Sequence, residues 1–194
     1  MSSSSRCAVP DAARRCLLRA LPVVVLAGCA ATRVLASTVP PEVVRDVPGA
    51  RLQGQGKLRY LGLHVYDAAL WSAQPVDAAS VERAVVALEL RYARALRGNL
   101  IAERSLEEMR RIGDIDDDAG ERWLAAMKRI FPDVAAGDRI TGVHWPGTGA
   151  RFHVNGRFVD EVADATFARL FFGVWLSART SQPQLRAALL GATT

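Results

Sequence analysis

Apolar residues occupy both faces of one long segment near the start of the chain, residues 54–71. Successive side chains of a strand point to opposite faces. One face of such a strand would carry Leu61, Leu63, Val65, Ala69 and Trp71. The other face would carry Tyr60, His64, Tyr66 and Leu70. We therefore predict one long strand whose two faces are both covered by other parts of the protein. Residues 86–92 alternate more strictly and predict a second, half-buried strand.

Helical spacing of apolar residues follows in two consecutive segments. The first segment starts at Asn99, carries Leu106 and Met109 on one face, and is expected to end at Gly113. The second segment is expected to stop before Pro132, because proline cannot continue a helix. Its apolar residues are Trp123, Leu124, Met127, Ile130 and Phe131. The acidic residues between the two segments predict a solvated turn with a helix N-cap.

The strand pattern returns over residues 140–145 and 152–159, with Asn155-Gly156 as a hairpin turn. Two further helices follow, one capped by Asp164 and one beginning at Pro183. This order of strands, helices, strands and helices favours an α+β fold, a large antiparallel sheet with helices over one face. The helix over residues 167–176 is more apolar than contact with one layer requires. With the segment at 54–71, it predicts a hydrophobic cleft.

The charge of the chain does not favour nucleic acid as a partner. The formal net charge is +5, and before residue 29 four arginines stand against one aspartate, which leaves only +2 for the rest. The remaining basic residues are interleaved with acidic ones, as in residues 103–111, so no basic stripe matches a phosphate backbone. We expect no nucleic-acid binding.

Residues 1–28 have the features of an export signal. Arginines precede a short apolar run at residues 21–26, and small residues follow it. The run is too short for a permanent membrane span. Leu26-Ala27-Gly28-Cys29 matches a bacterial lipobox, in which Cys29 would become the lipid-modified first residue of the mature chain. Two alternatives are ordinary cleavage after Ala36 and no export at all.

These features divide the chain into a signal at residues 1–28, a proline-rich tether at 29–48 and one domain at 49–194. We expect a periplasmic protein anchored in a membrane at most through lipid on Cys29. Ala30 follows that cysteine where inner-membrane retention would call for an aspartate, so the outer membrane is favoured.

The sequence supports neither a metal centre nor a cofactor. All three cysteines lie within the first 29 residues, so the domain has no thiol for a metal or a nucleophile. The three histidines, His64, His144 and His153, lack a ligand spacing. The acidic run at residues 114–118 departs from a calcium loop in the position of its glycine. The pairs Gly54/Gly56 and Gly147/Gly149 do not lead from a strand into a helix, and we expect turns or bulges there instead of phosphate sites.

Four polar residues on the predicted strands are candidates for ligand binding: Arg59, Tyr66, Tyr92 and Arg94. An arginine or tyrosine in an apolar cleft can hold a carboxylate or enolate head group while the cleft buries an apolar tail. The alternative is that these side chains extend to the sheet edge and are solvated there.

Three sequence blocks resemble the chalcone isomerase-like family, in its bacterial exported branch. They are the glycine pair before a strand that ends in residues 65–71, the block at 88–94, and residues 171–176 followed by 183–191. The resemblance covers about Gly49 to Gly191. It implies a large antiparallel sheet with helices over one face and a cleft between these layers.

The resemblance also implies which residues would catalyse flavanone ring closure in the plant enzymes of this family. The arginine position falls on Leu58 or Arg59, the threonine position on Leu61 and the tyrosine position on Ile101. Two hydroxyl partners of the substrate would therefore be missing, each worth several kcal/mol in typical oxyanion sites. Other members bind fatty acids without catalysis.

We therefore predict a non-catalytic binder of a small apolar or fatty-acid-like ligand. An isomerase or intramolecular lyase that acts on an enone-like substrate through different residues is one alternative. A protein-interaction scaffold whose cleft is filled by its own side chains is another.

Overall fold

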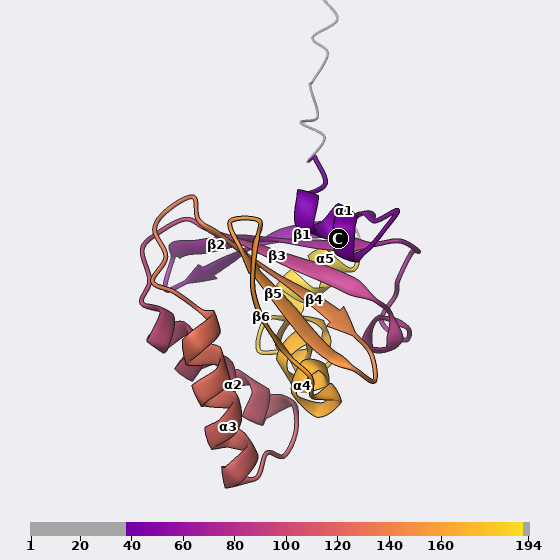
Figure 1. The fold of residues 1–194 in the computed structure, drawn as a ribbon. Helices are drawn as coiled ribbons and strands as arrows, with labels where there is room; N and C mark the ends of the chain where they lie inside the picture. Colours follow the sequence, from indigo (N-terminus) through magenta and orange to yellow (C-terminus); the bar gives the residue numbers. More distant parts are fainter. Residues whose placement is uncertain (1–37, 192–194) are drawn as a thin grey trace, which may run out of the picture. The chain divides into compact units, whose positions relative to one another are not determined.

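The computed structural model describes residues 38–191, which form one antiparallel sheet with helices on both faces (Figure 1). Six strands lie in sequence order, each antiparallel to its neighbour. They are β1 (Arg51–Tyr60), β2 (Leu63–Ser72), β3 (Val86–Tyr92), β4 (Arg139–Trp145), β5 (Gly149–Val154) and β6 (Arg157–Val162). The helices are α1 (Pro41–Asp46), the short 3-10 helix η1 (Val81–Arg83), α2 (Gly98–Ile112), α3 (Asp117–Ile130), α4 (Ala165–Leu176) and α5 (Pro183–Leu189). The predicted α+β class with a large antiparallel sheet is confirmed.

The single long strand predicted for residues 54–71 is wrong. The chain instead turns back at Leu61-Gly62, and β1 and β2 pair as a hairpin with Tyr60 opposite Leu63. Both turn residues have positive φ, 49° for Leu61 and 79° for Gly62, which is the backbone of a two-residue hairpin turn. Leucine is rare in this conformation and is apolar, so the hydrophobic pattern runs through the turn without a break.

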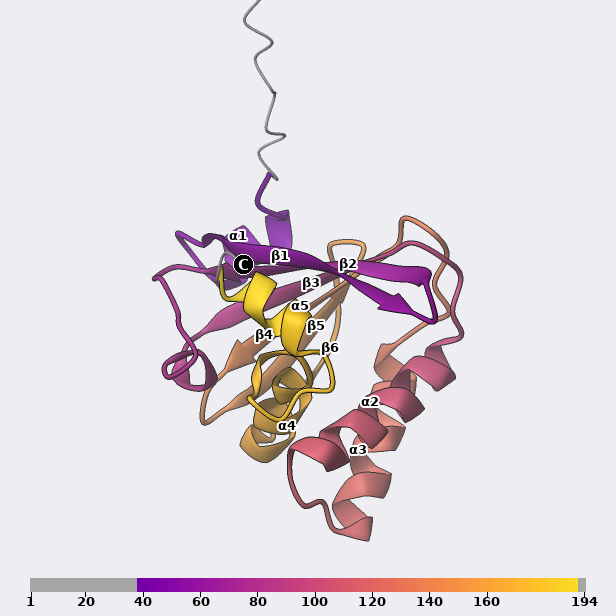
Figure 2. The same cartoon turned by 180° about the vertical axis from the view of Figure 1, so that it is seen from behind.

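Helices α2 to α5 cover one face of the sheet and bury most of the core against it (Figures 1 and 2). The predicted cap at the start of α4 is confirmed, because the Asp164 carboxylate accepts hydrogen bonds from the backbone N–H groups of Thr166 and Phe167 at 2.8 and 2.9 Å. Asp116 caps α3 in the same way, with a 2.7 Å bond from the Ala119 N–H. The apolar stripe of α4 is buried against β4 and β5.

The opposite face is partly covered by α1, in the segment expected to be a tether (Figure 2). The domain therefore begins before Gly49, since Val43 is fully buried and packs in a second core cluster with Trp71 and Val143. Proline at the first helical position starts this helix without the loss of a hydrogen bond. Six residues are too few for a periodic pattern, which explains why the sequence did not reveal it.

The Gly54/Gly56 pair allows α5 to pack closely against β1. A Cβ atom at Gly54 would lie 2.2 Å from the Ala188 carbonyl oxygen, and one at Gly56 would lie 2.7 Å from the Leu185 side chain. The register of β1 and β2 also shifts between Leu52 and Gly54, as expected for a bulge glycine. These glycines thus leave the space into which α5 packs against β1.

Candidate functional site

A cavity of about 440 Å³ lies between the sheet and helices α2 and α4. Its volume is within the range of small-molecule sites. Most of its wall is apolar and comes from strands β1 to β5, from α2, from α4 and from the connections that flank them. The lining residues that carry the argument below are Tyr66, Tyr92, Arg94, Arg104, Glu108 and Trp175.

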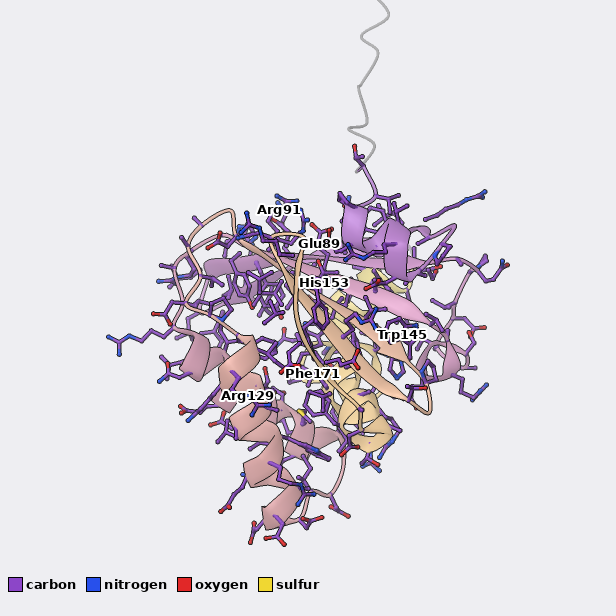
Figure 3. All side chains as sticks on the ribbon, viewed as in Figure 1. Glu89, Arg91, Arg129, Trp145, His153 and Phe171 are labelled. Carbon is purple, nitrogen blue, oxygen red and sulfur yellow. The ribbon has the colours of Figure 1, made fainter. Side chains whose placement is uncertain are left out.

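Aromatic rings form one wall of the cavity. Phe152 on β5 meets Phe171 on α4 edge to face, with ring centroids 5.2 Å apart, and Phe171 also meets Trp175 at 5.4 Å. Figure 3 shows Phe171 among the side chains between the sheet and α4. A Cβ atom at Gly142 would lie 3.1 Å from the tip of Phe172, so glycine lets this ring approach β4. The aromatic rings of this wall are therefore closely packed against one another and against the sheet.

Two tyrosines place hydroxyl groups in this apolar wall. The Tyr66 hydroxyl accepts a 2.9 Å hydrogen bond from the Trp175 indole N–H, and the ring of Tyr92 meets that of Tyr66 edge to face at 5.9 Å. Burial raises the pKa of Tyr66 far above its usual value, the bond from Trp175 opposes this, and the charge of Glu108 raises the pKa further. Burial raises the pKa of Tyr92 as well. Both phenols therefore stay neutral and act as hydrogen-bonding groups.

Glu108 brings a negative charge to the wall of the cavity. Its side chain is buried and forms an ion pair with Arg104 one turn earlier on α2. Arg111 lies 3.6 Å from the same oxygen, Oε1. The other oxygen, Oε2, has no hydrogen-bond partner among residues 38–191. A buried carboxylate with one free oxygen is costly, so this corner of the cavity favours hydrogen-bond donors and disfavours anions.

Arg94 supplies the unpaired positive charge of the site. It follows β3, lines the cavity and is exposed at its rim with Tyr60 and Leu100. Within the described part of the chain, Arg94 makes neither an ion pair nor a side-chain hydrogen bond. An anionic group that enters the cavity at this rim would therefore meet a free guanidinium group with two or more N–H donors.

Comparison with known proteins identifies the family. Residues 31–191 match the chalcone isomerase-like family. This chain belongs to the chalcone isomerase-like family. An uncharacterized protein of Haemophilus influenzae is 28% identical to it over 148 residues, which are 75% of this chain and 71% of that protein. A crystal structure of a fatty-acid-binding protein of Arabidopsis thaliana shares the fold, with a TM-score of 0.56 and 15% identity over 74% of this chain and 87% of the other.

The structure brings together three of the four predicted ligand-binding residues of this chalcone isomerase-like chain. Tyr66, Tyr92 and Arg94 line the cavity, whereas Arg59 is exposed and does not. The wall instead contains Leu58 and Tyr60, the residues on either side of Arg59. Arg59 therefore lies on the surface next to the hairpin turn and not in the cleft as predicted, because alternate residues of a strand face opposite sides.

The positions that correspond to the plant catalytic residues carry no hydroxyl into the cavity. Leu61 lies in the hairpin turn and is 86% exposed. Ile101 lines the cavity with an apolar side chain. The lipidation candidate, Cys29, lies outside the described residues.

Sequence reasoning missed Arg104 and Glu108, and it placed Trp175 on the apolar helix at the cleft without its hydrogen bond to Tyr66. The signal was present in α2, where Ile101, Ser105 and Glu108 share one helix face and all line the cavity. A charged residue in register with apolar neighbours is therefore the signal that could have located Glu108.

Residues 38–191 contain no group of three or more His, Cys, Asp or Glu side chains that could hold a metal ion. None of the helices in that range is long and apolar enough to cross a membrane.

Proposed function

We propose that this protein binds a long-chain carboxylate in the cavity, without converting it chemically. The observation that carries the proposal is an apolar cavity of about 440 Å³ with the unpaired guanidinium group of Arg94 at its rim. The Arabidopsis protein of similar fold is described as fatty-acid binding, which supports the same class of ligand for this chain.

The charges around the cavity decide which end of the ligand lies where. A carboxylate next to Tyr66 would meet the negative charge of Glu108, which already raises the pKa of that phenol. Arg94 forms no ion pair among residues 38–191, and Tyr92, the last residue of β3, precedes it by two residues. We therefore place the head group at Arg94 and Tyr92, and the tail along Phe171, Phe172 and Leu88.

Calorimetry with a series of saturated fatty acids tests this arrangement. Each methylene group that enters the cavity is expected to add up to about 0.8 kcal/mol, so affinity should rise with chain length until the cavity is full. Arg94→Gln should weaken binding of the acid about tenfold, the value of one charge-assisted hydrogen bond, and leave binding of the matching alcohol unchanged.

Arg59→Gln is the matched control, because Arg59 is exposed and lies outside the cavity wall. Its affinity for fatty acids should equal that of the wild type. An affinity that does not depend on chain length would contradict the proposal, as would equal losses from the two arginine variants.

We further propose that the chain is exported to the periplasm and anchored by lipid on Cys29. The lipobox at residues 26–29 supports this, and dual acylation is sufficient for stable membrane attachment. Cys29→Ala should move the protein from the membrane fraction to the soluble fraction. A wild-type protein that is already soluble and begins at Ser37 would contradict the anchor.

A further inference from the structure

Four of the six large apolar side chains of the described domain that are more than half exposed lie at the tip of the β1–β2 hairpin and the adjacent start of α2; the other two are Val44 and Phe158. Leu61 is 86% exposed, and Tyr60, Leu63 and Leu100 are each more than half exposed. We refer to these four residues as the hairpin patch. Surface leucines are common singly, but a group of this kind marks a site of contact.

The hairpin patch is continuous with the mouth of the cavity. Tyr60 from the hairpin and Leu100 from α2 both line the cavity, as do Val65 and Arg94. The two chain segments also touch through their backbones, because the Ala93 N–H donates a 2.9 Å hydrogen bond to the Val65 carbonyl. Figure 2 shows the β1–β2 hairpin turn and the start of α2 at the same end of the sheet.

Three exposed arginines flank this patch, and two acidic residues lie at its margin: the Asp67 carboxylate is 3.3 Å from His64 Nε2, and Asp133 accepts a hydrogen bond from the Gly98 N–H. Residues 59–66 and 92–102 contain three arginines, Arg59, Arg94 and Arg97, and no aspartate or glutamate. All three arginines are exposed, and none forms an ion pair among the described residues. Exposed apolar side chains flanked by cations match the interface of an anionic bilayer, where the apolar tips enter the acyl boundary and the cations meet lipid phosphates.

We propose that the hairpin patch docks this protein on anionic membranes, with the cavity mouth facing the lipid. Such docking would let an amphipathic ligand pass between bilayer and cavity without crossing water. The inference goes beyond the proposed function, because the patch would bind lipid whether or not the cavity holds a fatty acid. A second copy of the chain is a less suitable occupant, since it would bring three more unpaired arginines to the same contact.

An environment-sensitive fluorophore on the hairpin tests the docking directly. The full chain is used with Cys7, Cys16 and Cys29 replaced by serine, and Leu61→Cys provides the labelling site. Val159→Cys on β6 is the control, because it is also exposed but lies on the opposite edge of the sheet. Vesicles that contain phosphatidylglycerol should shift the emission of the label at 61 to shorter wavelength and leave the label at 159 unchanged.

Partition of the unlabelled protein onto the same vesicles provides the second measurement. Leu61→Ser should weaken partition about tenfold, because it removes one inserted apolar side chain. Arg97→Gln should weaken it about fivefold on anionic vesicles and not on phosphatidylcholine alone. Binding of a soluble short fatty acid should be unchanged in Leu61→Ser, which separates docking from the cavity.

Three results would overturn the inference. The first is a label at 61 that stays in water when vesicles are added. The second is a shift of equal size at 61 and 159. The third is a shift at 61 that needs no vesicles and grows with protein concentration, which would assign the patch to a second copy of the chain.

Discussion

The two faces of the sheet differ in how completely their buried carboxylates are paired. On the face that α1 covers, Glu42 accepts hydrogen bonds from Arg139 at 3.0 and 3.1 Å and from Thr141 at 2.9 Å. Asp46 and Glu89 on that side are also paired, with His153 at 2.7 Å and with Trp71 at 3.2 Å. On the face that α2 and α4 cover, Glu108 keeps one oxygen without a partner among residues 38–191, and it does so beside a cavity.

The difference separates a structural face from a binding face. Buried charges that are fully paired hold the parts they join in one geometry, and they leave no capacity for another molecule. A buried polar atom without a partner costs stability, and it is retained where a ligand or water can satisfy it. Figure 3 shows Glu89 on the side of α1 and Phe171 on the side of α4, one residue from each of these environments.

The largest effect on stability is expected from the structural face, with Glu42→Gln. The variant leaves the Arg139 guanidinium, which is mostly buried, with only Glu89 at 3.9 Å as a charged partner. Loss of one member of a buried pair typically lowers the free energy of unfolding by about 3 kcal/mol. Chemical denaturation measures this loss. Glu121→Gln is the control, because Glu121 is exposed on α3 and forms no ion pair among residues 38–191, and it should change stability by less than about 0.5 kcal/mol.

Measuring the fatty-acid affinity of Glu42→Gln tests whether the two faces act separately, because Glu42 lies across the sheet from the cavity. The folded fraction of Glu42→Gln should bind ligand as the wild type does. A stable Glu42→Gln variant, or a loss of stability no larger than that of the control, would show that the paired network is not what holds α1 in place.

The second prediction concerns pH and the helix-covered face. His144 is buried on β4 with its ring 4.9 Å from that of Phe172, and its Nδ1 has no partner among the described residues. Burial lowers the pKa of His144 to about 4, and a hydrogen bond with the Ala84 backbone opposes this only in part. The unfolded chain binds this proton near pH 6.5 and the folded chain near pH 4.

Stability from this group is therefore complete above about pH 6.5 and is lost as the pH falls toward 4. The loss should reach about 3 kcal/mol, since each pH unit contributes about 1.4 kcal/mol. Unfolding of the wild type and of His144→Phe, measured between pH 7 and pH 4, isolates this contribution from the other titrating groups. Equal slopes in the two proteins would refute the assignment to His144.

The third prediction compares a tryptophan introduced inside the cavity with a tryptophan introduced outside it. Val174 on α4 is half-buried and lines the cavity, whereas Val159 on β6 is exposed outside it. Val174→Trp should fill part of the cavity and weaken fatty-acid binding at least tenfold, while overpacking costs about 1–3 kcal/mol of stability at most. Val159→Trp should change neither. Calorimetry gives the affinities, and undiminished binding in Val174→Trp would place the ligand elsewhere.

The elements that could be predicted from the sequence are those whose signals are local. Helices α2, α3 and α4 follow from apolar spacing and from caps such as Asp164, all within about one helical turn of the boundary. The turn at Leu61-Gly62 was missed because a leucine with positive φ looks like a continuing strand. Helix α1 was missed because it has only six residues and because its contacts, such as the Glu42–Arg139 pair, join residues that are 97 apart in the sequence.

The same limit applies to the prediction of the site residues from the sequence. Tyr92 and Arg94 reach the cavity because they lie on and just after a strand, β3, whose alternation is regular. Arg59 does not, because it alternates with Leu58 and Tyr60, which face the cavity. Alternation along one strand shows which residues share a face, but not which of the two faces meets the cavity.

The smallest effect is expected on the rate of chalcone cyclisation. The cavity should not cyclise a chalcone at a useful rate, because Ile101 presents no hydroxyl there and Leu61 lies outside it in the hairpin turn. The hydroxyls that do reach the cavity, on Tyr66 and Tyr92, have pKa values that burial raises, so neither readily gives up its proton to activate a substrate. Chalcone consumption by the protein should match the rate in buffer when both are followed by absorbance. Tyr66→Phe serves as the control, and it should leave that rate unchanged. Turnover in the wild type that this variant abolishes would give the binding face a catalytic role and revive the isomerase alternative.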